Sequence, residues 1–157
     1  MPNTMSNDRG FSITELLVVI GLIGVLSLVA VPSVLTYWRN SSLTAGAEQL
    51  ASVMNRARQL AISQNRSVCV ERSGTNVRLR PTSNSPADCT GAVWTGVGTD
   101  SAGLIQIANS LQVSGAASAI FSNVGGASTT ATYTLTDPKT GLSRSVVVSS
   151  TGRVTIQ

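Results

Sequence analysis

The feature that most constrains this chain is an apolar run near its N-terminus. Residues 16–38 contain no charged side chain. Residues 16–35 alone supply the roughly 20 residues with which a helix crosses about 30 Å of hydrocarbon. We therefore expect the chain to be inserted in a membrane. Glu15 does not fit that setting, because an unpaired carboxylate at the edge of an apolar span costs about 2–3 kcal/mol. It therefore needs a partner.

A secretory signal peptide and a plain single-pass anchor each explain the apolar run incompletely. A secretory signal peptide is cut after small residues and follows a basic segment. A cut after Ala30 would have Leu28 at the third-last position and Pro32 just beyond it, and the segment before the run has only Arg9. A plain single-pass anchor explains the apolar run but not Glu15.

The residues around the run resemble a known signal. Gly10, Phe11, Glu15 and an apolar helix that contains Pro32 are similar to the class III signal of type IV pilins and type II secretion pseudopilins. The resemblance implies that a prepilin peptidase cuts after Gly10 and methylates Phe11. It also implies that Glu15 pairs with the N-terminal amine of a neighbouring subunit, so that each charge relieves the desolvation of the other.

The resemblance and the sequence pattern together divide the chain into four parts. Residues 1–10 form a leader, 11–38 a transmembrane and assembly helix, 39–66 an amphipathic half of the same helix, and 67–157 a β-rich domain. Pro32 is expected to kink or locally melt the helix. In the second half, apolar residues recur at spacings of three and four, which predicts a helix that covers a sheet with one face: Leu43, Ala47, Leu50, Met54, Ala57 and Ala61.

After residue 66 the apolar period changes to two. Short strands are predicted at residues 67–71, 76–80, 103–107, 119–121, 131–136, 144–149 and 153–156, with turn sequences of hairpin type between several of them. Residues 81–102 and 122–130 are rich in Ser, Gly and Thr and are predicted to be loops. The expected fold is α+β, a long N-terminal helix packed on antiparallel β-sheets.

Composition argues against an enzyme. The chain has no histidine and seven acidic residues, so histidine-based general base catalysis and histidine metal sites are excluded. We expect no catalytic residue, no metal and no cofactor. The net charge of +4 suits an anionic partner, but it also suits simple solubility.

Cys69 and Cys89 are the two cysteines. If the β-rich domain lies outside the cytoplasm, they can be oxidised there. We expect a disulfide between them, which would close a loop of about 20 residues and add roughly 3 kcal/mol in the chain-entropy model. The alternative is that Cys69 is a buried free thiol and Cys89 lies in a loop.

Residues 50–74 resemble the GspH/FimT group of minor pilins and pseudopilins. Some members of that group act in natural transformation, and the resemblance implies a C-terminal Gly-Arg-x-Arg motif. Here Gly152 and Arg153 match, but Thr155 replaces the second Arg. The candidate DNA-binding residues are Arg153, Arg144, Arg78 and Arg80. Arg78 and Arg80 alternate with apolar residues and so share a strand face, which is also the pattern of a solvated sheet surface.

The sequence therefore favours a low-copy minor pilin or pseudopilin that helps to initiate or cap a type IV pilus or a type II secretion pseudopilus. The expected partners are other pilin or pseudopilin subunits, the prepilin peptidase and the inner membrane. The β-rich domain would lie in the periplasm until the subunit enters the filament. The alternatives are a FimT-like minor pilin that binds DNA, and a single-pass anchored extracytoplasmic binding domain.

We expect the mature chain to begin at Phe11 with a methylated amine, because Gly10 and Phe11 resemble the prepilin cleavage site. The measurement is mass spectrometry of the N-terminal peptide of protein taken from membranes of cells with an active prepilin peptidase. A chain that begins at Met1 in such cells, or one cut beyond Ala30, would contradict this expectation.

Overall fold

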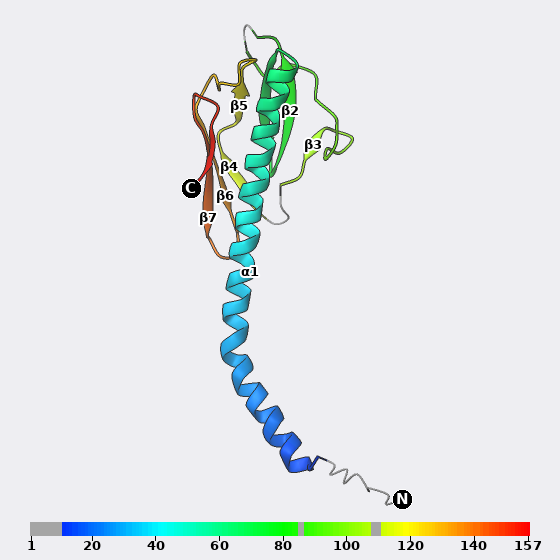
Figure 1. Ribbon diagram of the computed structural model, residues 1–157, viewed down its shortest axis with the longest axis vertical. Helices are drawn as coiled ribbons and strands as arrows, with labels where there is room; N and C mark the ends of the chain where they lie inside the picture. The colour runs from blue at the N-terminus through cyan, green and yellow to red at the C-terminus, as the bar shows by residue number, and fades with distance from the viewer. Residues whose placement is uncertain (1–10, 85–86, 108–110) are drawn as a thin grey trace, which may run out of the picture. The chain divides into compact units, whose positions relative to one another are not determined.

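The structure is a computed structural model of the chain (Figure 1), and it describes residues 11–84, 87–107 and 111–157, apart from the side chains of 29–33. The chain divides into two compact units, Met1–Trp38 and Arg39–Gln157. One helix, α1 (Ile13–Ser63), contributes to both units and is not interrupted at position 32. The expected local melting at Pro32 is therefore absent, and the Pro32 side chain lies outside the described residues.

In the first unit, α1 begins after Ser12. The hydroxyl of Ser12 accepts a hydrogen bond from the amide of Thr14 at 3.3 Å, and its carbonyl accepts the amides of Glu15 and Leu16. Ser12 thus acts as the N-cap. The large apolar side chains that follow are exposed along the described part of this unit, and they include Phe11, Ile13, Leu16, Leu17, Val18, Ile20, Leu22, Ile23, Val25, Leu26 and Leu28.

Across the part of the chain that the structure describes, no helix combines the length and apolar character needed to cross a membrane. The span expected at residues 16–35 includes 29–33, whose side chains are outside the description.

In the second unit, one face of α1 is buried as the spacing predicts. The buried residues are Leu43, Ala47, Leu50, Val53, Met54, Ala57 and Ala61. The opposite face, which includes Glu48, Ser52, Asn55 and Gln59, is exposed. The helix ends at Ser63, and Asn65 follows with a φ of 50°, a left-handed conformation that Asn adopts more readily than most residues.

In the described part of the chain, eight strands form two antiparallel four-stranded sheets. Sheet A has the order β3-β2-β1-β5 and sheet B the order β4-β6-β7-β8. The strands are β1 (Ser67–Ser73), β2 (Asn76–Thr82), β3 (Leu104–Ile105), β4 (Gln112–Gly115), β5 (Ser118–Phe121), β6 (Ala131–Thr136), β7 (Ser143–Val148) and β8 (Val154–Ile156). The predicted α+β fold is confirmed, and Figure 1 shows the second half of α1 beside the strands.

One core joins the helix to both sheets. Sheet A contributes its inward side chains, among them Val68, Val70 and Leu79, and sheet B contributes Tyr133 and Val146. All five are fully buried. The alternation of buried and half-exposed residues in β2 and β6 is the period of two that the sequence displays.

Apart from strand ends that shift by one or two residues, the strand predictions differ from the structure at two places. The strand expected at residues 103–107 is only Leu104–Ile105, and β4 (Gln112–Gly115) was not predicted. In β4 only Val113 is buried, so the segment carries almost no apolar period. Its strand conformation depends on pairing with β6, in which Val113 lies opposite Leu135, and a tertiary contact of this kind is invisible to local pattern.

The turn before β8 packs against a second loop with no room for side chains. Gly152 has a φ of 77° and Gly125 a φ of 86°, conformations that favour glycine. A Cβ atom on Gly152 would collide with the carbonyl oxygen of Gly125, and the Nε of Arg58 would lie 3.3 Å from it. Gly152, part of the proposed Gly-Arg motif, therefore has a structural role in this chain.

We expect Gly152→Ala to destabilise the fold by about 3 kcal/mol, since it adds a steric clash to the cost of a left-handed conformation. The matched control is Gly74→Ala. Gly74 has a φ of 64° and no atom within 4 Å of the added Cβ, so this change should cost only about 1 kcal/mol. Denaturant unfolding of the two variants measures the difference, and equal losses would contradict the packing role.

Candidate functional site

Helix α1 places Glu15 in its first turn. Ser12 is the N-cap, so Glu15 is the third helical residue, the position at which an acidic side chain interacts favourably with the helix dipole. Within the described residues Glu15 forms no ion pair. Phe11 lies just before the cap and is 78% exposed. The expected partner of Glu15 is therefore not supplied by the described part of this chain.

The predicted processing and assembly signal also includes Gly10 and Pro32. Gly10 lies outside the described residues, as does the side chain of Pro32. Their roles in cleavage and assembly stay predictions from the sequence.

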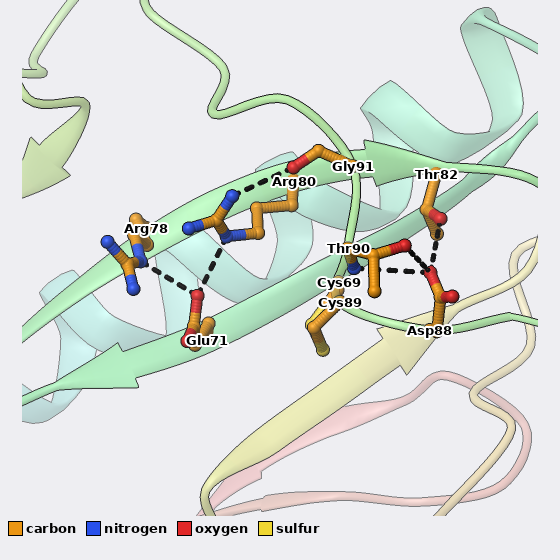
Figure 2. Close-up of a disulfide and its surroundings, with 9 residues drawn as sticks. All are labelled: Cys69, Glu71, Arg78, Arg80, Thr82, Asp88, Cys89, Thr90 and Gly91. Atoms are coloured by element: carbon orange, nitrogen blue, oxygen red, sulfur yellow. Dashed lines mark hydrogen bonds and ion pairs between the residues drawn. A yellow bond between two sulfur atoms is a disulfide. The ribbon is translucent and has the colours of Figure 1, made fainter.

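The outer face of sheet A carries a cluster of three charges (Figure 2). The Glu71 Oε2 atom accepts hydrogen bonds from the Nε of Arg78 at 2.7 Å and from the Nε of Arg80 at 2.8 Å. Glu71 lies directly opposite Arg78 in the β1–β2 register. One carboxylate therefore serves two guanidinium groups, and the cluster keeps one net positive charge.

These contacts stabilise the ionised carboxylate. Hydrogen bonds from Arg78 and then Arg80 lower the pKa of Glu71 below its usual value of 4.5, against a smaller opposing effect of burial. The same contact with Glu71 raises the pKa of Arg78. Arg78 and Arg80 are therefore paired with Glu71 on the sheet surface and are not two free cations.

A disulfide lies next to this cluster. The structure joins Cys69 of β1 to Cys89 with a Cα–Cα distance of 5.3 Å. Figure 2 shows the segment with Cys89, Thr90 and Gly91 crossing the strands, and the Gly91 carbonyl accepts a hydrogen bond from Arg80 at 2.8 Å. The disulfide fixes this segment to β1 at Cys69, which is fully buried.

Asp88 holds the same crossing segment. Its Oδ1 atom accepts hydrogen bonds from the hydroxyl of Thr82 at 2.7 Å and the hydroxyl of Thr90 at 2.8 Å (Figure 2). These bonds lower the pKa of the Asp88 carboxyl. Residues 87–91, part of a segment predicted only to be a loop, are thus tied to sheet A by a disulfide and by hydrogen bonds.

The structure divides the four candidate DNA-binding arginines between two sheets. Arg78 and Arg80 belong to β2 in sheet A, whereas Arg144 belongs to β7 and Arg153 precedes β8 in sheet B. Arg144 and Arg153 are both exposed. The partner role of Glu71 was missed from the sequence, since it depends on which residue lies opposite Arg78 in the hairpin.

Two arginines of α1, Arg39 and Arg56, hold loops against the helix through contacts that were not foreseen. Arg39 lies 3.8 Å from the Asp137 carboxylate in the β6–β7 turn. The pKa of Asp137 is lowered, first by the amide of Lys139 and further by Thr140 and Arg39.

The Arg56 guanidinium lies 4.6 Å from the Trp94 ring centre and donates to the Val97 carbonyl at 2.6 Å. Trp94 and Arg56 lie far apart in sequence, so no local pattern links them.

None of the described residues form a group of three or more acidic or cysteine side chains that could hold a metal ion. The charged clusters described above instead join strands and loops. Their carboxylates are occupied by hydrogen bonds from the protein itself.

Two family models match the chain. The model described as "Type II transport protein GspH" matches residues 46–152. The model described as "Prokaryotic N-terminal methylation motif" matches residues 5–31, which include Gly10, Phe11 and Glu15. No curated protein matches the chain.

Solved structures show a similar fold. In one crystal form, the type IV minor pilin FimU of Pseudomonas aeruginosa is 19% identical, with a TM-score of 0.56; the match covers 77% of this chain and 92% of FimU. In a second crystal form the identity is 20% and the TM-score 0.51, with 73% and 92% covered. At these identities the likeness concerns the fold.

We expect Glu71→Gln to lower stability at neutral pH, because a charged acceptor of two arginine hydrogen bonds is lost. The pKa of Glu71 is depressed in the folded state, so its contribution is complete above the ordinary value of 4.5 and is lost as the pH falls through the folded pKa. The difference in melting temperature between parent and variant should therefore be a few degrees at pH 7 and should vanish at low pH.

The matched control is Glu48→Gln on α1, where the carboxylate is exposed and forms no ion pair among the described residues. Thermal unfolding from pH 7 to pH 3 compares both variants with the parent. A Glu71→Gln difference that persists unchanged at pH 3, or one matched by Glu48→Gln, would show that the ion-pair cluster is not its cause.

Proposed function

Because the chain belongs to the GspH family of minor pilins and pseudopilins, we propose that it is a low-copy subunit that helps to initiate or cap a filament. The family and the fold are those of structural subunits and not of enzymes. The observation that carries the proposal is the N-terminal methylation motif at residues 5–31, which coincides with a helix whose apolar side chains are exposed.

The exposed apolar side chains of residues 11–28 supply the driving force for membrane insertion and for packing in the filament. A helix that is apolar on all sides needs a nonpolar environment. The inner membrane provides it before assembly, and packing against the helices of other subunits provides it in the filament. The family implies that the N-terminus is anchored in the inner membrane and that the domain lies in the periplasm.

Glu15 sets the axial position at which the helices of neighbouring subunits pack. Its carboxylate has no ion-pair partner among the described residues, and a charge in an apolar setting is costly unless it is neutralised. After cleavage at Gly10, the methylated amine of Phe11 on a neighbouring subunit is a suitable cation. One ion pair between successive subunits then fixes how far one helix slides along the next.

Two filament systems, the type II secretion pseudopilus and the type IV pilus, fit this role. The family model is named for type II transport, whereas the solved structures of similar fold are of a type IV minor pilin. We therefore propose the role that both share, a minor subunit at or near the filament tip, partnered by other pilin or pseudopilin subunits and processed by a prepilin peptidase.

DNA binding is not the function that this arrangement favours. Two of the four candidate arginines, Arg78 and Arg80, are paired with Glu71. Two exposed arginines remain on sheet B, and Thr155 occupies the place of a further one. Two guanidinium groups hold a phosphate much better than one does, so the chain lacks the paired arrangement at its C-terminal motif.

We expect Glu15→Gln and Glu15→Ala to reduce incorporation into filaments, each by about tenfold, because both remove the charge that pairs with the neighbouring amine. Glutamine retains the ability to cap the helix, so a helix-start defect would appear only in the alanine variant. Quantitative immunoblots of sheared filaments and of membranes give the incorporated fraction. Normal incorporation of Glu15→Gln would contradict the ion-pair role.

A further inference from the structure

Three segments that are far apart in the sequence meet at the C-terminal end of α1. They are the helix end, the loop after β5 and the turn before β8 (residues 58–66, 122–127 and 149–153). The Asn123 side chain in the loop donates a hydrogen bond to the Asn65 side chain at the helix end, at 2.9 Å. The Ala127 amide donates to the Ser150 carbonyl in the turn at 3.0 Å. These hydrogen bonds join the three segments in one surface.

Arg58 of α1 lies where the loop and the turn approach each other. Its Nε atom would be 3.1 Å from a Cβ atom on Gly125 and 3.3 Å from one on Gly152. This Nε atom is buried and has no hydrogen-bond partner within the described residues, although the residue as a whole is half-exposed. No carboxylate in the described part of the chain pairs with the Arg58 guanidinium. The two glycines therefore allow a cation to lie at this surface without a partner in the chain.

Two further arginines belong to the same surface. Arg66 follows the end of α1, and Arg153 is the last residue of the turn. Both are exposed, and neither forms an ion pair with a described residue. None of the three segments contains an Asp or a Glu. The surface thus carries three positive charges and no negative charge of its own.

Two exposed aliphatic side chains lie next to Arg58. Ile62 is one helical turn after it and is 51% exposed, and Val124 in the loop is 81% exposed. The Cδ1 atom of Ile62 would be 2.9 Å from a Cβ atom on Gly125, the residue that follows Val124. We call this surface the helix-end patch, and its members are Arg58, Ile62, Arg66, Val124 and Arg153. Apolar side chains beside charged ones are typical of protein–protein interfaces.

The chemistry of the helix-end patch favours a protein partner with carboxylates. Aliphatic side chains gain from burial against apolar groups, which a phosphate backbone does not offer, and the patch has no aromatic side chain on which a base could stack. A second copy of this chain is a poor match. Among the described acidic residues of the second unit, only Glu48 is exposed and free of hydrogen bonds and ion pairs. One free carboxylate is too few for three arginines on three segments.

We propose that the helix-end patch docks an acidic surface of a different filament subunit. Carboxylates of that subunit pair with Arg58 and Arg153, and an apolar side chain packs on Ile62 and Val124. A guanidinium binds a carboxylate through two parallel hydrogen bonds, and its planar group loses little freedom for each bond formed. The inference rests on the proposed function, because the partner is another subunit of the same filament.

Site-specific cross-linking of the full chain in cells tests the docking. A diazirine amino acid at position 124 reacts with whatever covers the patch, since the native Val124 side chain is exposed. In sheared filaments we expect a cross-link to another filament subunit, at a site next to Asp or Glu side chains. Peptide mass spectrometry identifies that subunit and maps the site.

Charge reversal tests the role of the arginines. Arg153→Glu should lower the cross-link yield about tenfold, because it places like charges opposite each other. The matched control is Lys139→Glu, which changes the net charge equally at an exposed position in the β6–β7 turn, outside the patch, and should leave the yield unchanged. Replacing the mapped carboxylate of the partner by arginine should restore the yield with Arg153→Glu. Equal yields in the Arg153→Glu and Lys139→Glu chains would overturn the proposal.

Arg58→Met separates docking from stability. Methionine keeps an apolar stem beside Gly125 and Gly152 and removes the unbonded Nε donor, so the melting temperature should stay the same or rise. The cross-link yield should nevertheless fall about fivefold, because a charged partner of the carboxylate is lost. A lower melting temperature with an unchanged cross-link yield would make Arg58 a structural residue and overturn its docking role.

The remaining outcomes each overturn a different part. Capture of a second copy of this chain, of nucleic acid or of lipid at position 124 would overturn the assignment to a different subunit. No capture, with the chain present in the filaments, would overturn the docking and leave the proposed function intact. Absence of the unmodified chain from filaments would overturn both.

Discussion

Burial of one face of α1 against two sheets is the interaction on which the second unit depends. The stripe from Leu43 to Ala61 belongs to the same core as the inward side chains of β1, β2, β6 and β7. Neither sheet could bury its apolar face alone, and a four-stranded sheet with one exposed apolar face is not stable in water. The helix is therefore the shared surface that makes sheets A and B one unit.

The same sequence uses two kinds of helix surface. From residue 43 onward the apolar positions form one stripe, and the polar positions, such as Ser52 and Asn55, are exposed. Before residue 29 the described apolar side chains are exposed on all sides. The apolar stripe from residue 43 onward is buried within the chain, whereas the apolar surface before residue 29 needs a nonpolar environment from outside the chain. This contrast is the physical basis for assigning the chain to a filament.

The sequence predicted what local periodicity encodes. The buried stripe of α1 and the strand at 131–136 agree with the structure residue by residue. Strand β4, with a single buried valine, could not be found because its pairing with β6 is a tertiary contact. The shared face of Arg78 and Arg80 was predicted, but its meaning changed once the register placed Glu71 opposite Arg78, where its carboxylate pairs with both arginines. Likewise, Gly152 belongs to a motif that suggested phosphate contact, yet its lack of a side chain is required by the nearby carbonyl of Gly125.

If this chain is a minor filament subunit, it should be countable in purified filaments. Quantitative mass spectrometry with isotope-labelled peptides from the β-rich domain would compare it with the major subunit in filaments sheared from cells and freed of membrane. We expect the chain at a small, reproducible fraction of the major subunit, with enrichment in short filaments, where tips are more numerous. Absence of the chain from filaments of cells whose membranes contain it, or a copy number equal to the major subunit, would rule out the role of a minor subunit.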